Sequence, residues 1–136
     1  MAVTDRFRQQ HADIMAVAGS IEGCLGSAAQ AAAARTALNS LAGKLSIHLA
    51  MEDTSLYPRL GSHPEIELRN MAQSFAAEMA GIKQVFLDYN KKWSERAIAD
   101  DFQAFATQTK AVLEALKNRI KRENTQLYAL YDRTAG

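Results

Sequence analysis

Residues 48–58 read HLAMEDTSLYP, and residues 119–128 read RIKRENTQLY. Aligned on their glutamates and on the Leu-Tyr pairs that follow, the two segments share one pattern, with His48 opposite Arg119. Both place charged or imidazole side chains where the inner face of a helix bundle carries leucine. Buried polar groups cost free energy unless they bind a ligand or one another. The repeated segment therefore indicates two helices whose inner faces contribute to a polar centre.

Apolar residues on both sides of these segments recur at the three- and four-residue spacing of a helix face. Breaks at 26–27, at 61–64 and near residue 94 divide the chain into four such segments, roughly 4–25, 28–60, 64–93 and 98–131. Amphipathic helices joined by short connections pack their apolar stripes together. The sequence predicts an all-α fold, an antiparallel up-down-up-down four-helix bundle, and a single domain over residues 1–136.

Composition narrows the function classes. Of the 136 residues, 48% are hydrophobic and 23% are charged, and the formal net charge is +1. So small a net charge gives no field for holding nucleic acid or anionic lipid, and we expect neither as a partner. The single cysteine, Cys24, excludes an internal disulfide and is expected to pack within the first helix. No apolar run approaches the length of a membrane span, so we expect a cytoplasmic protein.

Polar residues on three of the predicted apolar stripes form the candidate site: His11, His48, Glu52, Arg119 and Glu123. His48 and Glu52 are four residues apart, so both can point from one helix face at one cation. His11 falls within about two turns of His48 when residues are counted back from the connection between the first two helices. Tyr57 and Tyr128, near helix ends, are expected to pack at the end of the bundle with their hydroxyls in water.

The chain resembles the hemerythrin family, the bacterial HHE cation-binding domains, over nearly its whole length. The resemblance rests on His11, on residues 48–58, on the pair Glu78-Met79 in the third helix, and on residues 119–128. It implies an antiparallel four-helix bundle with two non-haem irons, bridged by carboxylates and capped by histidines. It also implies a role in binding or sensing dioxygen, or in handling iron, nitric oxide or peroxide.

Two departures from the family pattern change this expectation. Met79 stands where the family has a histidine after Glu78, and Arg119 stands where the family has another. Methionine is a soft ligand poorly suited to ferrous iron, and arginine stays protonated and cannot ligate. By the resemblance, His11, His48, Glu52 and Glu123 remain candidate metal ligands, with Glu78 and Met79 lining the pocket. A normal di-iron site is not expected.

Arg119 supplies positive charge where the second metal would sit, and two interpretations of the centre remain open. In one, the polar residues close on themselves without any metal as a salt-bridged network. In the other, one ion (iron first, zinc or manganese otherwise) binds His11, His48 and Glu52, with Glu123 or Glu78 as a further oxygen ligand.

The first functional hypothesis is a degenerate binding, sensing or signalling module that holds at most one metal ion and does not carry dioxygen reversibly. A mononuclear non-haem iron protein that reacts with dioxygen or peroxide is an alternative, and a metal-free structural or partner-binding bundle is another. The sequence gives no catalytic constellation, so a non-enzyme is favoured. A protein partner, a second copy of the chain, or a small diatomic or peroxide ligand remains compatible with it.

Overall fold

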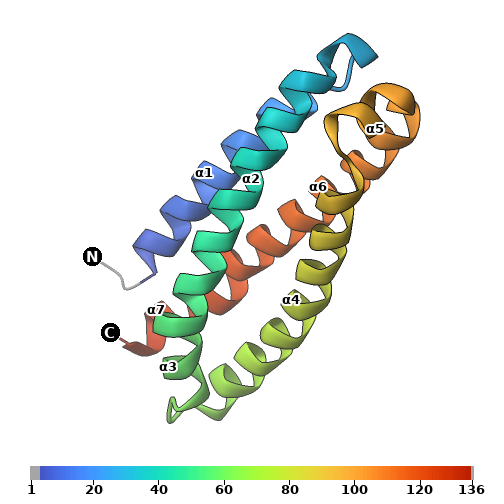
Figure 1. Cartoon of the computed structure of the whole chain (residues 1–136). Coiled ribbons are helices and arrows are strands. Elements are labelled where there is room, and N and C mark those ends of the chain that lie inside the picture. Colours follow the sequence, from blue (N-terminus) through green and yellow to red (C-terminus); the bar gives the residue numbers. More distant parts are fainter. Residues whose placement is uncertain (1–3, 136) are drawn as a thin grey trace.

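Four long helical rods form the structure, a computed structural model that describes residues 4–135 (Figure 1). The first two rods, with the short 3-10 turn η1 between them, comprise α1 (Asp5–Glu22), η1 (Ala28–Gln30), α2 (Ala31–Met51), η2 (Glu52–Leu56) and α3 (Tyr57–Gly61). The other two comprise α4 (Ile66–Lys92), the short α5 (Glu95–Asp100), α6 (Phe102–Arg122), η3 (Glu123–Leu127) and α7 (Tyr128–Ala135). The predicted all-α four-helix bundle is confirmed.

The segment boundaries differ from the prediction in two places. The first helix ends at Glu22, so Cys24 lies just beyond it, half-buried, and not within it. The segment predicted over 98–131 is interrupted, because Ser94 caps α5 and Asp101 caps α6 through hydrogen bonds from the backbone N–H groups of Ala97 and Ala104. Side-chain oxygens at these positions satisfy N–H groups that have no partner within the helix.

The two described ends of the chain lie at the same end of the bundle (Figure 1). Thr4 donates a hydrogen bond to the carboxylate of Asp132 at 2.7 Å, and Arg8 pairs with the same carboxylate at 3.3 Å. These contacts hold the start of α1 against α7. They join the first and last rods at the end of the bundle, about two turns from the level of His11 and Glu123.

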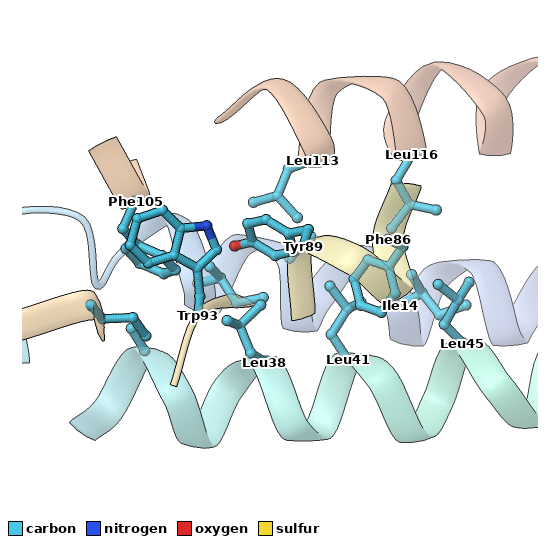
Figure 2. Close-up of a cluster of buried hydrophobic side chains, with 14 of the residues drawn as sticks. Ile14, Leu38, Leu41, Leu45, Phe86, Tyr89, Trp93, Phe105, Leu113 and Leu116 are labelled. Atoms are coloured by element: carbon cyan, nitrogen blue, oxygen red, sulfur yellow. The ribbon is translucent and has the colours of Figure 1, made fainter. Parts of the chain in front are cut away.

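The apolar core has two parts. The larger one fills the end of the bundle near α5, where Trp93 and Phe105 pack edge to face with ring centroids 5.4 Å apart, above Leu38 (Figure 2). The smaller one, which includes Leu56, Leu68 and Leu127, fills the other end. Burial of each such leucine stabilises the fold by about 1.5–3 kcal/mol.

A polar layer separates the two apolar clusters along every rod that contributes to it. On α1, His11 lies between Phe7 of one cluster and Ile14 of the other. On the last rod, Arg119 and Glu123 lie between Leu116 and Leu127. The predicted polar residues therefore share one level of the bundle.

No helix in the described part of the chain is both long and apolar enough to cross a membrane.

Candidate metal centre

Both copies of the repeated segment leave the α-helical ladder at their glutamate. A π-helical turn runs over Glu52–Leu56 in one rod and over Glu123–Leu127 in the other. The backbone N–H of Tyr57 bonds the carbonyl of Glu52, and that of Tyr128 bonds the carbonyl of Glu123, five residues back in each case. Such turns are rare and are frequently found at functional sites. The shared sequence pattern is thus matched by a shared local structure.

Two histidines from different helices face the same glutamate. His11 of α1 and His48 of α2 are each 2% exposed, and their rings lie 4.5 Å apart. The Nε2 atom of His11 lies 2.8 Å from Glu123 Oε1, and that of His48 lies 3.9 Å from the same oxygen. His48 Nε2 is also 3.0 Å from Glu52 Oε1. His11, His48 and Glu123 each offer a ligand atom within 4.8 Å of the others.

The far side of each imidazole is held by a carboxamide. His11 Nδ1 lies 2.7 Å from Asn124 Oδ1, and His48 Nδ1 lies 2.6 Å from Gln10 Oε1. Gln10 donates its amide N–H to the sulfur of Met51, which leaves its oxygen for the histidine. An amide oxygen only accepts, so both Nδ1 atoms carry protons. In the neutral rings, the Nε2 lone pairs therefore face the carboxylates, as in metal-binding histidines oriented by an outer partner.

Sequence reasoning missed both carboxamides. Each lies next to a predicted site residue in the chain, Gln10 before His11 and Asn124 after Glu123. This adjacency was the feature of the sequence that could have identified them.

The second oxygen of Glu123 faces a different set of groups. Arg119 Nη2 donates to Glu123 Oε2 at 3.2 Å and to the Tyr57 hydroxyl at 3.1 Å, and that hydroxyl donates to Glu123 Oε2 at 3.0 Å. The guanidinium, 2% exposed, lies 4.5 Å from the centre of the Phe75 ring. Glu123 thus lies between the two histidines on one side and Arg119 on the other.

The expectation that Tyr57 and Tyr128 keep their hydroxyls in water is wrong. Each hydroxyl bonds the glutamate of the opposite repeat: Tyr57 bonds Glu123, and Tyr128 lies 2.5 Å from Glu52 Oε2. In an α-helix, five residues turn the chain by about 500°, which places residue i+5 about 140° away from residue i. The i→i+5 turn takes more residues per revolution and returns the tyrosine toward the inner face. Glu-x-x-x-x-Tyr in both repeats was the sequence signal.

The two buried carboxylates of the centre differ in the direction of their pKa shifts. Burial alone would raise the pKa of Glu123, but its pairing with His11 and His48 and the charge of Arg119 bring that pKa well below its usual range. For Glu52, burial and the nearby charge of Glu123 prevail and raise the pKa. Burial opposes a charge on His48, yet Glu123 and Glu52 outweigh it and raise the His48 pKa to about 9. Glu123 is therefore the fixed anion of the centre.

Glu78 and Met79, predicted to line the pocket, lie on its α4 side. Glu78 is partly exposed and bonds Arg122 Nη1 at 2.6 Å, with Arg119 Nη1 at 3.6 Å. The hydrogen bond from Arg122 holds the pKa of Glu78 below its usual range. Neither Glu78 nor Glu52 belongs to the cluster of His11, His48 and Glu123 found among the described residues, and Glu52 meets that cluster through His48 Nε2 at 3.0 Å. Met79, half-buried, lines a small internal cavity with His48, Glu52 and Arg119.

The donor set fits one cation. His48 Nε2 is buried and makes no hydrogen bond to any residue in 4–135, although Glu52 Oε1 lies 3.0 Å away. Ligand atoms about 2.1 Å from one ion and at right angles to each other lie about 3 Å apart, close to the 2.8 and 3.0 Å separations seen here. The cavity of about 10 Å³ that these residues themselves line has room for one ion or one water molecule. Arg119 already holds the other oxygen of Glu123, at 3.2 Å.

The comparison with known families agrees with this geometry. The model of the hemerythrin HHE cation-binding domain matches residues 2–131. The chain belongs to the hemerythrin HHE cation-binding family. No curated protein and no solved structure gives a significant match. The family resemblance inferred from the sequence is confirmed, and with it a hemerythrin-type bundle whose family binds cations. The ligand roles of the individual residues remain predictions.

Proposed function

We propose that this hemerythrin-type chain is a binding or sensing module for one cation, held by His11, His48, Glu52 and Glu123. Arg119 takes the place of the second cation. The observation that carries the proposal is that the two oxygens of Glu123 face different groups. Oε1 faces the histidines, and Oε2 accepts hydrogen bonds from Arg119 and Tyr57. A carboxylate so placed joins one metal position to one fixed positive charge.

The residues around the cation each have a distinct task. Gln10 and Asn124 hold the imidazoles by their Nδ1–H groups, so that both Nε2 atoms face inward. Tyr128 holds Glu52 by its second oxygen, which leaves Oε1 for the ion. When bound, the cation would act as a Lewis acid toward a small ligand.

Arg119 limits the centre to one ion. A guanidinium is permanently charged, and its Nη2 lies 3.2 Å from the oxygen that a second metal would need. Reversible carriage of dioxygen in the family uses two irons, and Arg119 leaves a place for one. We therefore propose that the chain does not carry dioxygen reversibly.

The donor chemistry favours ferrous iron. Two imidazoles and one carboxylate form the set typical of non-haem iron(II), and manganese and zinc accept the same ligands. A fourth protein ligand narrows the room for exogenous ligands. This agrees with the small size of the cavity beside His48 and Met79.

One observation favours a second candidate, a metal-free bundle whose polar core serves structure or partner binding. The His11–Glu123 and His48–Glu52 separations, 2.8 and 3.0 Å, are also those of directly paired protonated histidines and carboxylates. In that case the layer is a closed ion-pair network. Metal content separates the two candidates.

The deciding experiment is metal loading of the purified chain. We expect about one equivalent of iron(II) after anaerobic loading, or of manganese or zinc, measured by elemental analysis after desalting. His48→Gln should lower the content below a tenth of an equivalent. The control His63→Gln should retain the metal, because His63 bonds the backbone of Glu65 in the loop before α4. Less than a tenth of an equivalent in the native chain would overturn the proposal in favour of the metal-free bundle.

A gain-of-function variant tests the role assigned to Arg119. Replacing Met79 and Arg119 together by histidine restores the two imidazoles of the family pattern, so the iron content should rise from one equivalent toward two. An iron content that stays at one equivalent would show that positions 79 and 119 do not belong to the binding site of a second metal.

A further inference from the structure

The middle of α4 packs loosely against the rest of the bundle. Phe75 and Phe86 are buried, but no residue from 76 to 85 is fully buried. Val85 is 60% exposed although it is a large apolar residue. Protein interiors are normally packed as densely as organic crystals, so a stretch of ten residues without a buried side chain leaves unfilled space beside it.

That space is a hollow of about 350 Å³ between α4 and α6. Its floor is formed by Leu45, Phe86 and Leu116, each at most 5% exposed, and Leu45 belongs to α2 on the far side of the gap. Ile82 and Val112 form its walls. The hollow therefore reaches from the surface to the side chains at the centre of the bundle.

The lining defines the chemistry of an occupant. Glu78 is the one ionisable side chain that lines the hollow within the described chain, and it is already held by Arg122 at 2.6 Å and faces Arg119. No free charge remains there to bind a charged ligand. The other lining residues are aliphatic, aromatic or glycine, so binding would be driven by the burial of apolar surface.

The volume of the hollow is too small for a helix from a partner or from a second copy. A helix with its side chains is about 10–12 Å wide. One helical turn of that width, about 5.4 Å long, takes up more than about 400 Å³, so a helix could lie across the opening of a hollow of about 350 Å³ but could not fit into it. A cavity of about 150 Å³ lined by apolar side chains suffices to bind benzene. The larger hollow here suits a molecule of one or two rings.

We propose that the hollow between α4 and α6 is a binding site for one small, uncharged, apolar molecule. This site is separate from the cation site, and it does not depend on a bound metal. Leu45 and Leu116 line both the hollow and the small cavity of the polar centre. A molecule bound in the hollow thus lies one layer of side chains away from His48 and Glu123.

Gly81 provides a clean way to fill the hollow. It lines the hollow, and a Cβ built at this position meets no heavy atom within 4 Å. Gly81→Leu places an isobutyl group in the space, and leucine is a better helix former than glycine, so the variant should fold. Gly43 is the matched control, because it lies within α2, also has open space around its Cβ, and does not line the hollow.

The experiment titrates the full chain with indole, an uncharged two-ring probe, and with indole-3-acetate, its charged counterpart. Binding is followed by the NMR shifts of the Ile82 and Val112 methyl groups. We expect saturable 1:1 binding of indole with a submillimolar Kd, and at least tenfold weaker binding of indole-3-acetate. Gly81→Leu should weaken indole binding at least tenfold, whereas Gly43→Leu should change it less than twofold.

Three outcomes would overturn the proposal. The first is the absence of saturable shifts up to the solubility limit of indole, and the second is equal binding by the two glycine variants. The third is movement of the same methyl signals with protein concentration, together with a dimer in sedimentation, because the hollow would then be part of a face between two copies.

Discussion

Replacing Arg119 with alanine removes the positive charge at the centre of the polar layer. The guanidinium is 2% exposed, donates to Glu123 and Tyr57, and lies over the Phe75 ring. A hydrogen bond to a charged group contributes about 1.5–3 kcal/mol, and a desolvated cation–π contact contributes about 2 kcal/mol. These contributions share one side chain and do not add. Breaking a buried ion pair costs about 3–5 kcal/mol, so we expect a loss of about 4 kcal/mol in the free energy of unfolding.

Urea unfolding of the metal-free chain, followed by circular dichroism, measures this loss. With an m-value of about 2 kcal/mol/M, the midpoint should fall by about 2 M urea. Arg122→Ala is the matched control, because Arg122 pairs with Glu78 and also lies over the Phe75 ring, at 5.1 Å, but is 43% exposed. Exposed ion pairs contribute about 0.2–1 kcal/mol, so its midpoint should fall by about 0.5 M or less.

The reasoning is refuted if the two variants lose equal stability. It is also refuted if Arg119→Ala stays within about 1 kcal/mol of the native chain. In either case, Arg119 would not be the group that neutralises Glu123.

Two further predictions concern the histidines. Gln10→Leu and Asn124→Leu should each weaken zinc binding about 10–100-fold in competition with a chromophoric chelator, because the imidazoles lose their orientation. The control Gln9→Leu, at the exposed neighbouring position, should leave the zinc affinity unchanged. Undiminished zinc affinity in Gln10→Leu and Asn124→Leu would show that the carboxamides do not position the ligands. In the metal-free chain, the pKa of His48 is raised from 6.5 to about 9, so the stability it contributes is fully present below pH 6.5 and is lost as the pH rises to about 9. The free energy of unfolding, obtained from urea unfolding curves, should fall by about 3 kcal/mol between pH 6 and pH 9.5, and this fall should be absent in His48→Gln. A free energy of unfolding that does not change with pH in the native chain would contradict the pairing of His48 with the carboxylates.

The sequence by itself determined the helices and the level at which polar residues enter the core. Apolar residues at three- and four-residue intervals specify one face of each helix, because 3.6 residues complete a turn. His11, His48, Glu52, Arg119 and Glu123 lie on those faces and are all 2% exposed. Their burial follows from local periodicity, which any single helix carries in its own sequence.

The tertiary structure alone decided which atoms meet across the layer. Gln10 is next to His11 in the chain but holds His48 of the neighbouring helix, and each tyrosine bonds the glutamate of the other repeat. Glu78 reaches Arg122 and Arg119, not the histidines. These pairings depend on the π-helical turns, which rotate Tyr57 and Tyr128 inward, and on the distances between rods. The inward rotation of the tyrosines and the spacing of the rods arise only when separate segments pack together. They therefore cannot be read from the helical periodicity of one segment.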